Sequence, residues 1–127
     1  MQALARITLW LGGLGFLGFG IAFLVDPLGL FALTGIELEG SVAAVELRAF
    51  YGGLEVGLGL FLLAADLAGA HRPGLLLALA SYGGIALARV LGLAIAGGGS
   101  GFLWAALAVE ATLALLALVA LLGQRRG

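Results

Sequence analysis

The sequence contains no cysteine and no lysine, and its one histidine is His71. Without cysteine the chain cannot form a disulfide, use a thiolate nucleophile or bind a metal through sulfur. A single histidine cannot build a histidine-based metal site or ligate haem on both sides, and we interpret His71 as a solvated loop residue. We therefore expect no metal and no cofactor. The absence of lysine is typical of a GC-rich genome, or of a consensus or designed sequence, and indicates no function.

Charged residues are also scarce. They make up 10% of the 127 residues, and the formal net charge is −1. The few arginines are scattered, so there is no basic patch that could bind nucleic acid. The sequence also has no phosphate-binding loop, no dinucleotide-binding glycine motif in a βαβ context and no Ser-His-Asp set. Signals of soluble-enzyme chemistry are therefore few.

Apolar residues dominate instead, at 63% of the chain, with a mean hydropathy of +1.22. A soluble domain usually has about 45–50% apolar and about 25% charged residues. A helix needs about 20 apolar residues to cross the hydrocarbon core of a bilayer, and four segments are long enough. We predict an all-α fold in which residues 1–127 form a single domain, a four-helix transmembrane bundle. Its helices are expected at about 7–25, 41–67, 74–96 and 102–122.

Polar and helix-breaking residues separate the predicted spans. Asp26-Pro27 ends the first span, because proline lacks an N–H and restricts the residue before it. Residues 71–74 separate the second span from the third, and the glycine-rich run 97–101 separates the third from the fourth. Residues 27–33 are apolar but too short to cross, so they predict a short interfacial helix after the first span.

The distribution of charge predicts the orientation. Four spans place both termini on one side, which holds four arginines: Arg6, Arg72, Arg125 and Arg126. The loops on the other side carry only acidic charges: Asp26, Glu37 and Glu39. Under the positive-inside rule we expect a multi-pass membrane protein with both termini in the cytoplasm. Trp10 and Trp104 are expected at the two membrane interfaces.

Glycine occurs 23 times, and much of it lies inside the predicted helices. Between helices in lipid there is no hydrophobic driving force, and small residues allow the close backbone contact that holds them together. Two stripes have the required spacing of four residues, Gly53 with Gly57 and Gly84 with Ala88 and Gly92. We interpret them as helix-packing residues. The packing is either within one bundle or at the face of a homo-oligomer.

Five ionisable residues lie well inside the predicted spans: Glu46, Arg48, Glu55, Arg89 and Glu110. An ionised group at the centre of a bilayer costs about 2.5–3.5 kcal/mol, so such groups usually face the bundle interior and pair. At about 1.5 Å per residue from the outer ends of the spans, four of the five lie about 8–12 Å deep, and Glu55 lies about 20 Å deep. Their similar depth indicates a common cluster.

We predict that Arg48, Glu55, Arg89 and Glu110 converge between the second, third and fourth spans. Arg48 and Glu55 are seven residues apart, so they share one face of an α-helix. Tyr51 and Tyr82 would add polar groups nearby, whereas Glu46 lies about 200° from Arg48 around an α-helix and points elsewhere. The cluster either binds a ligand, ion or proton, or only fixes the helix register through Arg–Glu pairs. Glu55, the deepest, is the candidate for proton coupling.

The same residues carry a family resemblance. The stretches that carry it are 46–55 (ELRAFYGGLE) with Gly57 and Gly59, 81–84 (SYGG), 89–93 (RVLGL) and Glu110. With them the chain resembles a bacterial family of small four-helix membrane proteins known only as a domain of unknown function. The short Glu55-x-Gly57-x-Gly59 segment is also similar to DoxX-like proteins, which have been tied to quinone-linked redox complexes and to partner-protein roles. The resemblance implies a four-helix bundle in a bacterial inner membrane.

Three functions remain open. The first is binding or transport of a small molecule, ion or lipid that reaches the charged cluster from the outer side. The second is a structural or partner subunit of a membrane complex, in which the charges only fix helix packing and the glycine stripes recruit a partner protein or a second copy. The third is an intramembrane enzyme that uses Glu55 or Glu110 as acid or base, which the sequence favours least.

Overall fold

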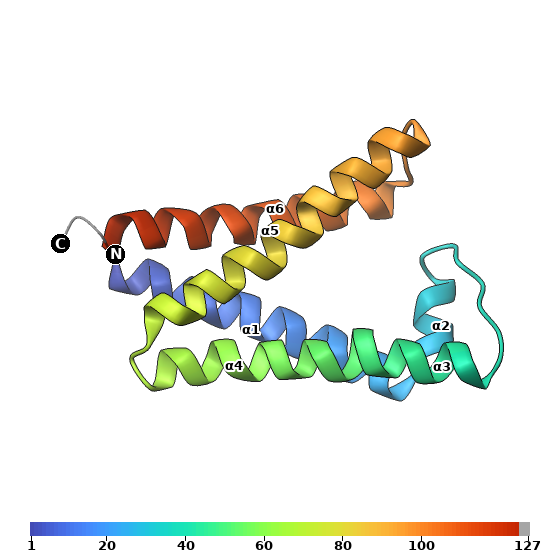
Figure 1. The fold of residues 1–127 in the computed structure, drawn as a ribbon, viewed down its shortest axis with the longest axis horizontal. Helices are drawn as coiled ribbons and strands as arrows, with labels where there is room; N and C mark the ends of the chain where they lie inside the picture. The colour runs from blue at the N-terminus through green and yellow to red at the C-terminus, as the bar shows by residue number, and fades with distance from the viewer. Residues whose placement is uncertain (125–127) are drawn as a thin grey trace.

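Four long apolar helices run along one axis in the computed structural model, which describes residues 1–124 (Figure 1). Each is long and apolar enough to cross a membrane: Gln2–Val25, Ser41–Leu67, His71–Ala96 and Gly101–Gln124. Residues 1–124 contain no strand. The predicted all-α fold with four transmembrane helices is confirmed. Arg125 and Arg126, two of the arginines used for the orientation, lie outside the described residues.

The first, third and fourth spans are the uninterrupted helices α1 (Gln2–Val25), α5 (His71–Ala96) and α6 (Gly101–Gln124). The start of α1 and the end of α6 lie at one end of the bundle, which we call the termini end (Figure 1). The short helix α2 (Pro27–Ala32) lies at the opposite end, where residues 27–33 predicted a helix. The Asp26 carboxylate caps it by accepting a hydrogen bond from the Gly29 N–H at 3.0 Å.

The second span has three parts. They are α3 (Ser41–Leu47), a π-helical segment η1 (Arg48–Leu54) and α4 (Glu55–Leu67). We call all three together helix 2. A π-helix bonds each N–H to the carbonyl five residues back instead of four, so it changes the angular relation between the residues before and after it. The seven-residue rhythm predicted for Arg48 and Glu55 assumed an unbroken α-helix and does not apply here.

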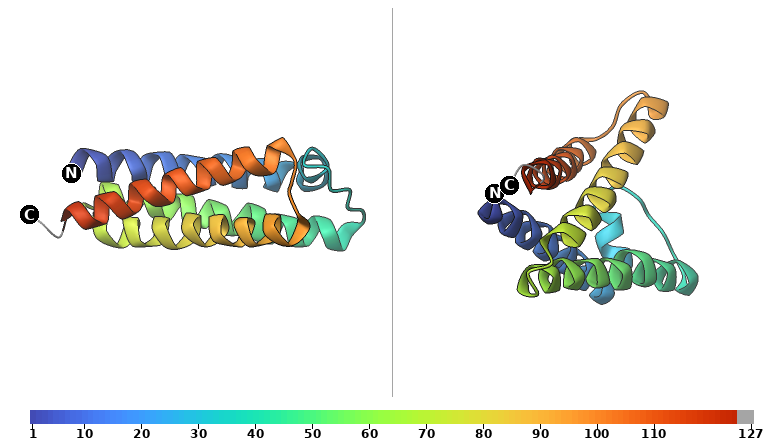
Figure 2. Two further views of the ribbon diagram at one scale, coloured as in Figure 1. Left: turned by 90° about the horizontal axis from the view of Figure 1, so that it is seen from above. Right: turned by 60° about the vertical axis from the view of Figure 1, so that its left-hand side comes forward.

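Two helix pairs make up the bundle. In the first, α1 packs along α4 and η1; in the second, α5 packs along α6. A core of buried side chains joins the pairs in the half nearest the termini end and includes Leu9, Leu62, Leu75 and Ala117. Away from this core α5 moves steadily apart from helix 2 (Figures 1 and 2). The bundle is therefore closed towards the termini end and spread towards the end that holds α2.

Glycines bring α1 and helix 2 into close contact. A Cβ atom on Gly20 would lie 2.8 Å from the Gly52 carbonyl oxygen, and one on Gly59 would lie 2.7 Å from the Gly13 carbonyl oxygen. Only a hydrogen in place of a side chain fits at these distances, so the two backbones touch directly. In lipid, this close contact replaces the hydrophobic force as the source of helix association.

The small residues predicted for helix packing lie elsewhere. A Cβ on Gly57, Gly84 or Gly92 would meet nothing within 4 Å, and Gly53 would meet only the Arg48 carbonyl oxygen at 3.7 Å. Ala88 is exposed as well. The spacing of four did not identify the faces that touch, because this sequence has many glycines that could take that role. Packing within this bundle is thus not their role, and a contact with a second copy stays a prediction.

The connection between the second and third spans is also shorter than expected. Residues 71–73 form the first turn of α5 and not a linker. Proline is tolerated there, because the first N–H groups of a helix have no carbonyl to bond. At its other end α5 stops at Gly97, whose φ of +73° is a left-handed conformation that glycine adopts without strain.

Candidate functional site

Arg89 and Glu110 form an ion pair between α5 and α6. The Arg89 Nε and Nη2 groups donate hydrogen bonds of 2.8 and 2.6 Å to the two Glu110 carboxylate oxygens. Both side chains are largely buried, with exposed fractions of 24% and 13%. A bidentate pair is the strongest geometry for these groups. The two residues that were predicted to meet here do meet, and each satisfies the other's charge.

Glu55, the first residue of α4, has no such partner. Its carboxylate makes no hydrogen bond or ion pair within residues 1–124, although the residue is part-buried in the middle of an apolar span. It lies within electrostatic range of Glu110 on α6 and of the Tyr82 hydroxyl on α5. Glu55 therefore lies near the α5–α6 pair, and its carboxylate has no partner within the described part of the chain.

The two predicted tyrosines take different positions beside it. Tyr82 is buried, stacks on Phe16 at a ring-centroid distance of 4.3 Å, and donates a 2.7 Å hydrogen bond from its hydroxyl to the Gly12 carbonyl. Tyr51, on η1, is 40% exposed and lies within electrostatic range of Arg89. The ring of Tyr82 therefore lies in the core, whereas the ring of Tyr51 is partly exposed and packs on Phe23 and Phe31.

Arg48 and Glu46 do not join this group. The Arg48 Nε donates a 3.0 Å hydrogen bond to the Leu24 carbonyl in the last turn of α1. The last carbonyls of a helix lack partners and carry partial negative charge, so they attract a cation. Glu46 is exposed and makes no hydrogen bond or ion pair within residues 1–124. The predicted convergence of four charges is thus incomplete, because Arg48 is held by α1.

The residues that do gather are Tyr51, Glu55, Tyr82, Arg89 and Glu110, which we call the Glu55 cluster. Tyr51 and Glu55 come from helix 2, Tyr82 and Arg89 from α5, and Glu110 from α6. The segment η1 packs on α1 and α2, and α5 packs on α6. Tyr51 is exposed and Glu55 is only part-buried, so the cluster reaches the surface of the bundle.

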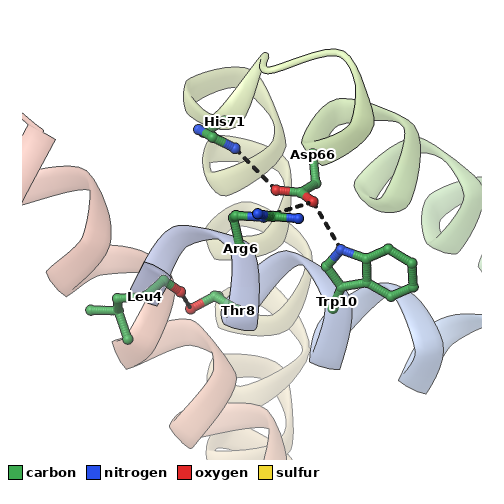
Figure 3. Close-up of polar contacts among 6 residues, drawn as sticks. All are labelled: Leu4, Arg6, Thr8, Trp10, Asp66 and His71. Atoms are coloured by element: carbon green, nitrogen blue, oxygen red, sulfur yellow. Dashed lines mark hydrogen bonds and ion pairs between the residues drawn. The ribbon is translucent and has the colours of Figure 1, made fainter. Parts of the chain in front are cut away.

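A second polar group, at the termini end, was missed. The Asp66 carboxylate is 1% exposed and is bonded by three donors (Figure 3). Trp10 Nε1 donates to it at 2.9 Å, Arg6 Nε at 3.4 Å and His71 Nε2 lies 3.0 Å away. This Asp66 cluster fastens α1 to α4 and to the start of α5.

His71 is therefore not the solvated loop residue that the sequence suggested, because its side chain is 20% exposed and packs on Asp66. A signal for this cluster existed. Arg6 and Trp10 are four residues apart and share a face of their helix. Asp66 and His71 flank the short connection 68–70 at the same end of the bundle. Every polar side-chain atom buried within residues 1–124 has a hydrogen-bond partner, so this cluster is satisfied.

An apolar groove of about 380 Å³ lies between α5 and α6 at the end opposite the termini. It is lined by Val90, Leu93, Ala94, Gly97, Gly98, Trp104 and Leu107. Neither Arg89 nor Glu110 lines it, so the groove is separate from the Glu55 cluster. Within residues 1–124, no group of three or more histidine and acidic side chains could hold a metal ion.

Comparison with known proteins gives one match. The model of a family described as a domain of unknown function, DUF4345, matches residues 4–121, nearly the whole chain. The chain belongs to the DUF4345 family. No curated protein and no solved structure matches this DUF4345 chain. The family resemblance read from the sequence is thereby confirmed, while the likeness to DoxX proteins stays a prediction.

Proposed function

We propose that this DUF4345 protein binds a small amphipathic molecule or lipid within the membrane, at the Glu55 cluster. The observation that carries the proposal is the carboxylate of Glu55, which has no partner within residues 1–124 although it lies in a membrane-spanning helix. A charge at this depth costs about 2.5–3.5 kcal/mol. A ligand that pairs with the carboxylate would offset that cost.

The structural alternative explains the other charges better than it explains Glu55. The Arg89–Glu110 pair and the Asp66 cluster each join two or three helices and leave no buried polar atom without a partner. Such pairs fix helix register, which is the role that a structural subunit would need. Glu55 bonds no other helix, so register cannot be the reason for a carboxylate at this position.

The cluster also lies where a ligand could reach it from the bilayer. The Tyr51 ring is 40% exposed and Glu55 is only part-buried, so both reach the surface of the bundle. An amphipathic molecule could place its polar group against Glu55 and leave its apolar part among lipid tails and apolar side chains. This arrangement resembles that of many ligand sites, which are mostly apolar with a few polar groups that fix orientation.

The test measures thermal stability of the purified protein in detergent with cationic, anionic, zwitterionic and uncharged amphiphiles. The variants are Glu55→Gln and a matched control, Glu46→Gln, which removes an exposed glutamate from the same span. At least one class of amphiphile should raise the melting temperature of the wild type and of Glu46→Gln but not of Glu55→Gln. If no class stabilises the wild type, or Glu55→Gln responds equally, the proposal is wrong.

A further inference from the structure

The charges around Glu55 do not balance, and the imbalance indicates what the ligand is. Within residues 1–124 no arginine or histidine forms an ion pair with Glu55. Glu110 is already paired with Arg89 through two hydrogen bonds, and together they carry no net charge. Arg48 keeps its positive charge, but its side chain is exposed and bonded to the Leu24 carbonyl at the end of α1, outside the Glu55 cluster. When Glu55 is ionised, the Glu55 cluster therefore has a net charge of −1.

An anion is a poor match for this arrangement. It would meet the Glu55 carboxylate, and it would have to displace Glu110 to reach Arg89. Arg89 already donates two short hydrogen bonds in the bidentate geometry that carboxylates favour. A positively charged ligand needs no such exchange, because the carboxylate of Glu55 is available without breaking a bond of the described chain.

An exposed aromatic ring accompanies the carboxylate. Tyr51 lies four residues before Glu55 and is 40% exposed. Its ring packs against Phe23, at a centroid distance of 5.2 Å, and against Phe31, at 5.4 Å. The face of an aromatic ring attracts cations, and the attraction grows when the cation is out of water. Tyr51 thus presents a partly exposed ring, packed on two phenylalanines, about one helical turn before the unpartnered carboxylate.

A bare metal ion fits less well than an organic cation. Calcium takes six to eight oxygen ligands, and magnesium keeps several of its waters. Around Glu55 the chain offers one free carboxylate, while the Tyr82 hydroxyl is bonded to Gly12 and the Glu110 carboxylate to Arg89. Few oxygens are left to replace a shell of water. An organic cation has a diffuse charge and an apolar body. It therefore needs neither a set of oxygen ligands nor a retained shell of water.

We infer that the ligand is a lipophilic organic cation whose charge lies between the Glu55 carboxylate and the Tyr51 ring. This inference rests on the proposed function and narrows it to one class of ligand. The residues that hold the charge come from helix 2, and Arg89 and Glu110 stay paired when the ligand is bound. The apolar substituents of the cation face the region where α5 separates from helix 2.

Two probes of the same shape and opposite charge test the inference. Tetraphenylphosphonium and tetraphenylborate differ in the sign of the charge, so their binding to the purified protein in lipid nanodiscs is compared by equilibrium dialysis. The wild type should bind the phosphonium saturably and the borate at least tenfold more weakly. Glu55→Gln should lose at least tenfold in phosphonium affinity, Tyr51→Leu about fivefold, and the control Glu46→Gln nothing beyond twofold.

A second measurement uses the wild type alone and does not depend on the folding of a variant. A hydrophobic carbodiimide modifies carboxyl groups within membranes, and peptide mass spectrometry reports the modification of Glu55. Saturating phosphonium should slow this modification at least threefold, and the borate should not. Equal slowing by both probes, or no slowing by the phosphonium, would contradict the inference.

The outcomes separate this inference from the proposed function. If anionic or uncharged amphiphiles bind in a Glu55-dependent manner and the phosphonium does not, the protein binds a ligand at Glu55, but the inference that this ligand is a cation is wrong. If no amphiphile of any class binds, both the proposed function and the inference of a cationic ligand are wrong. If the phosphonium binds equally to the wild type and to Glu55→Gln, its site is elsewhere and the inference fails.

Discussion

The contact between α1 and α4 should respond to a single methyl group. In Gly59→Ala the new Cβ would lie 2.7 Å from the Gly13 carbonyl oxygen and 2.8 Å from the Leu17 nitrogen. Both are backbone atoms, so the contact can be relieved only if the helices move apart. The matched control is Gly57→Ala on the same helix, where a Cβ would meet nothing within 4 Å.

Both substitutions gain a similar amount, about 1 kcal/mol, from the higher helix propensity of alanine. Overpacking a close contact lowers stability by about 1–3 kcal/mol, and of the two variants only Gly59→Ala is overpacked. We therefore expect its free energy of unfolding to be about 1–3 kcal/mol lower than that of Gly57→Ala. Reversible unfolding in mixed micelles, followed by circular dichroism, measures the difference.

A third variant checks whether the loss of stability comes from contact with backbone atoms. In Gly52→Ala the Cβ would press mainly on the Leu24 side chain, 2.7 Å from Cδ2. A side chain can turn away, so this variant should lose less stability than Gly59→Ala, and Leu24→Ala should restore part of the loss. If Gly59→Ala is as stable as Gly57→Ala, the two backbones do not touch and the fold described for this pair is wrong.

Three further predictions use the same unfolding assay. Arg89→Gln and Glu110→Gln should each lower the free energy of unfolding by about 3–5 kcal/mol, because each leaves a largely buried charge without its partner. The double variant should lose less than the sum of the two, and additive losses would show that the pair is not coupled. Trp10→Phe removes one donor to the Asp66 carboxylate and should lower the free energy of unfolding by about 1.5–3 kcal/mol. The control Trp104→Phe replaces an exposed tryptophan that makes no such hydrogen bond, so it should change stability little. Equal effects of the two substitutions would contradict the Trp10–Asp66 hydrogen bond. Gly92→Ala, with nothing within 4 Å of its Cβ, should not destabilise the monomer, and a loss of stability that depends on protein concentration would show that a second copy covers this face.

The spans were predictable from the sequence because their cause is local. About 20 apolar residues in a row are enough to call a transmembrane helix, and this sequence has four such runs separated by proline and glycine. The predicted contact of Arg89 with Glu110 also held. These two residues are similarly deep in consecutive spans, and few other groups there could satisfy either charge.

The remaining errors concern contacts between helices, which depend on how each helix is rotated. Of the glycines with suitable spacing, the structure uses Gly13, Gly20, Gly52 and Gly59, and not Gly53 and Gly57. A rotation of one residue decides between Gly52 and Gly53, and no periodicity in so glycine-rich a helix fixes it. Asp66 was missed for a similar reason, because its donors come from α1 and α5 and meet only in the folded bundle.

The π-helical segment accounts for the most consequential of these differences. In an unbroken α-helix, residues seven apart share a face to within about 20°, so Arg48 would lie above Glu55 and could neutralise it. The segment η1 includes Arg48 and ends at Leu54, directly before Glu55. The Arg48 side chain bonds the end of α1 and forms no ion pair with Glu55. An interruption of this kind costs regular hydrogen bonding and is frequent at functional sites. Here its effect is to leave the Glu55 carboxylate uncompensated beside Tyr51, which is the condition that a cationic ligand requires.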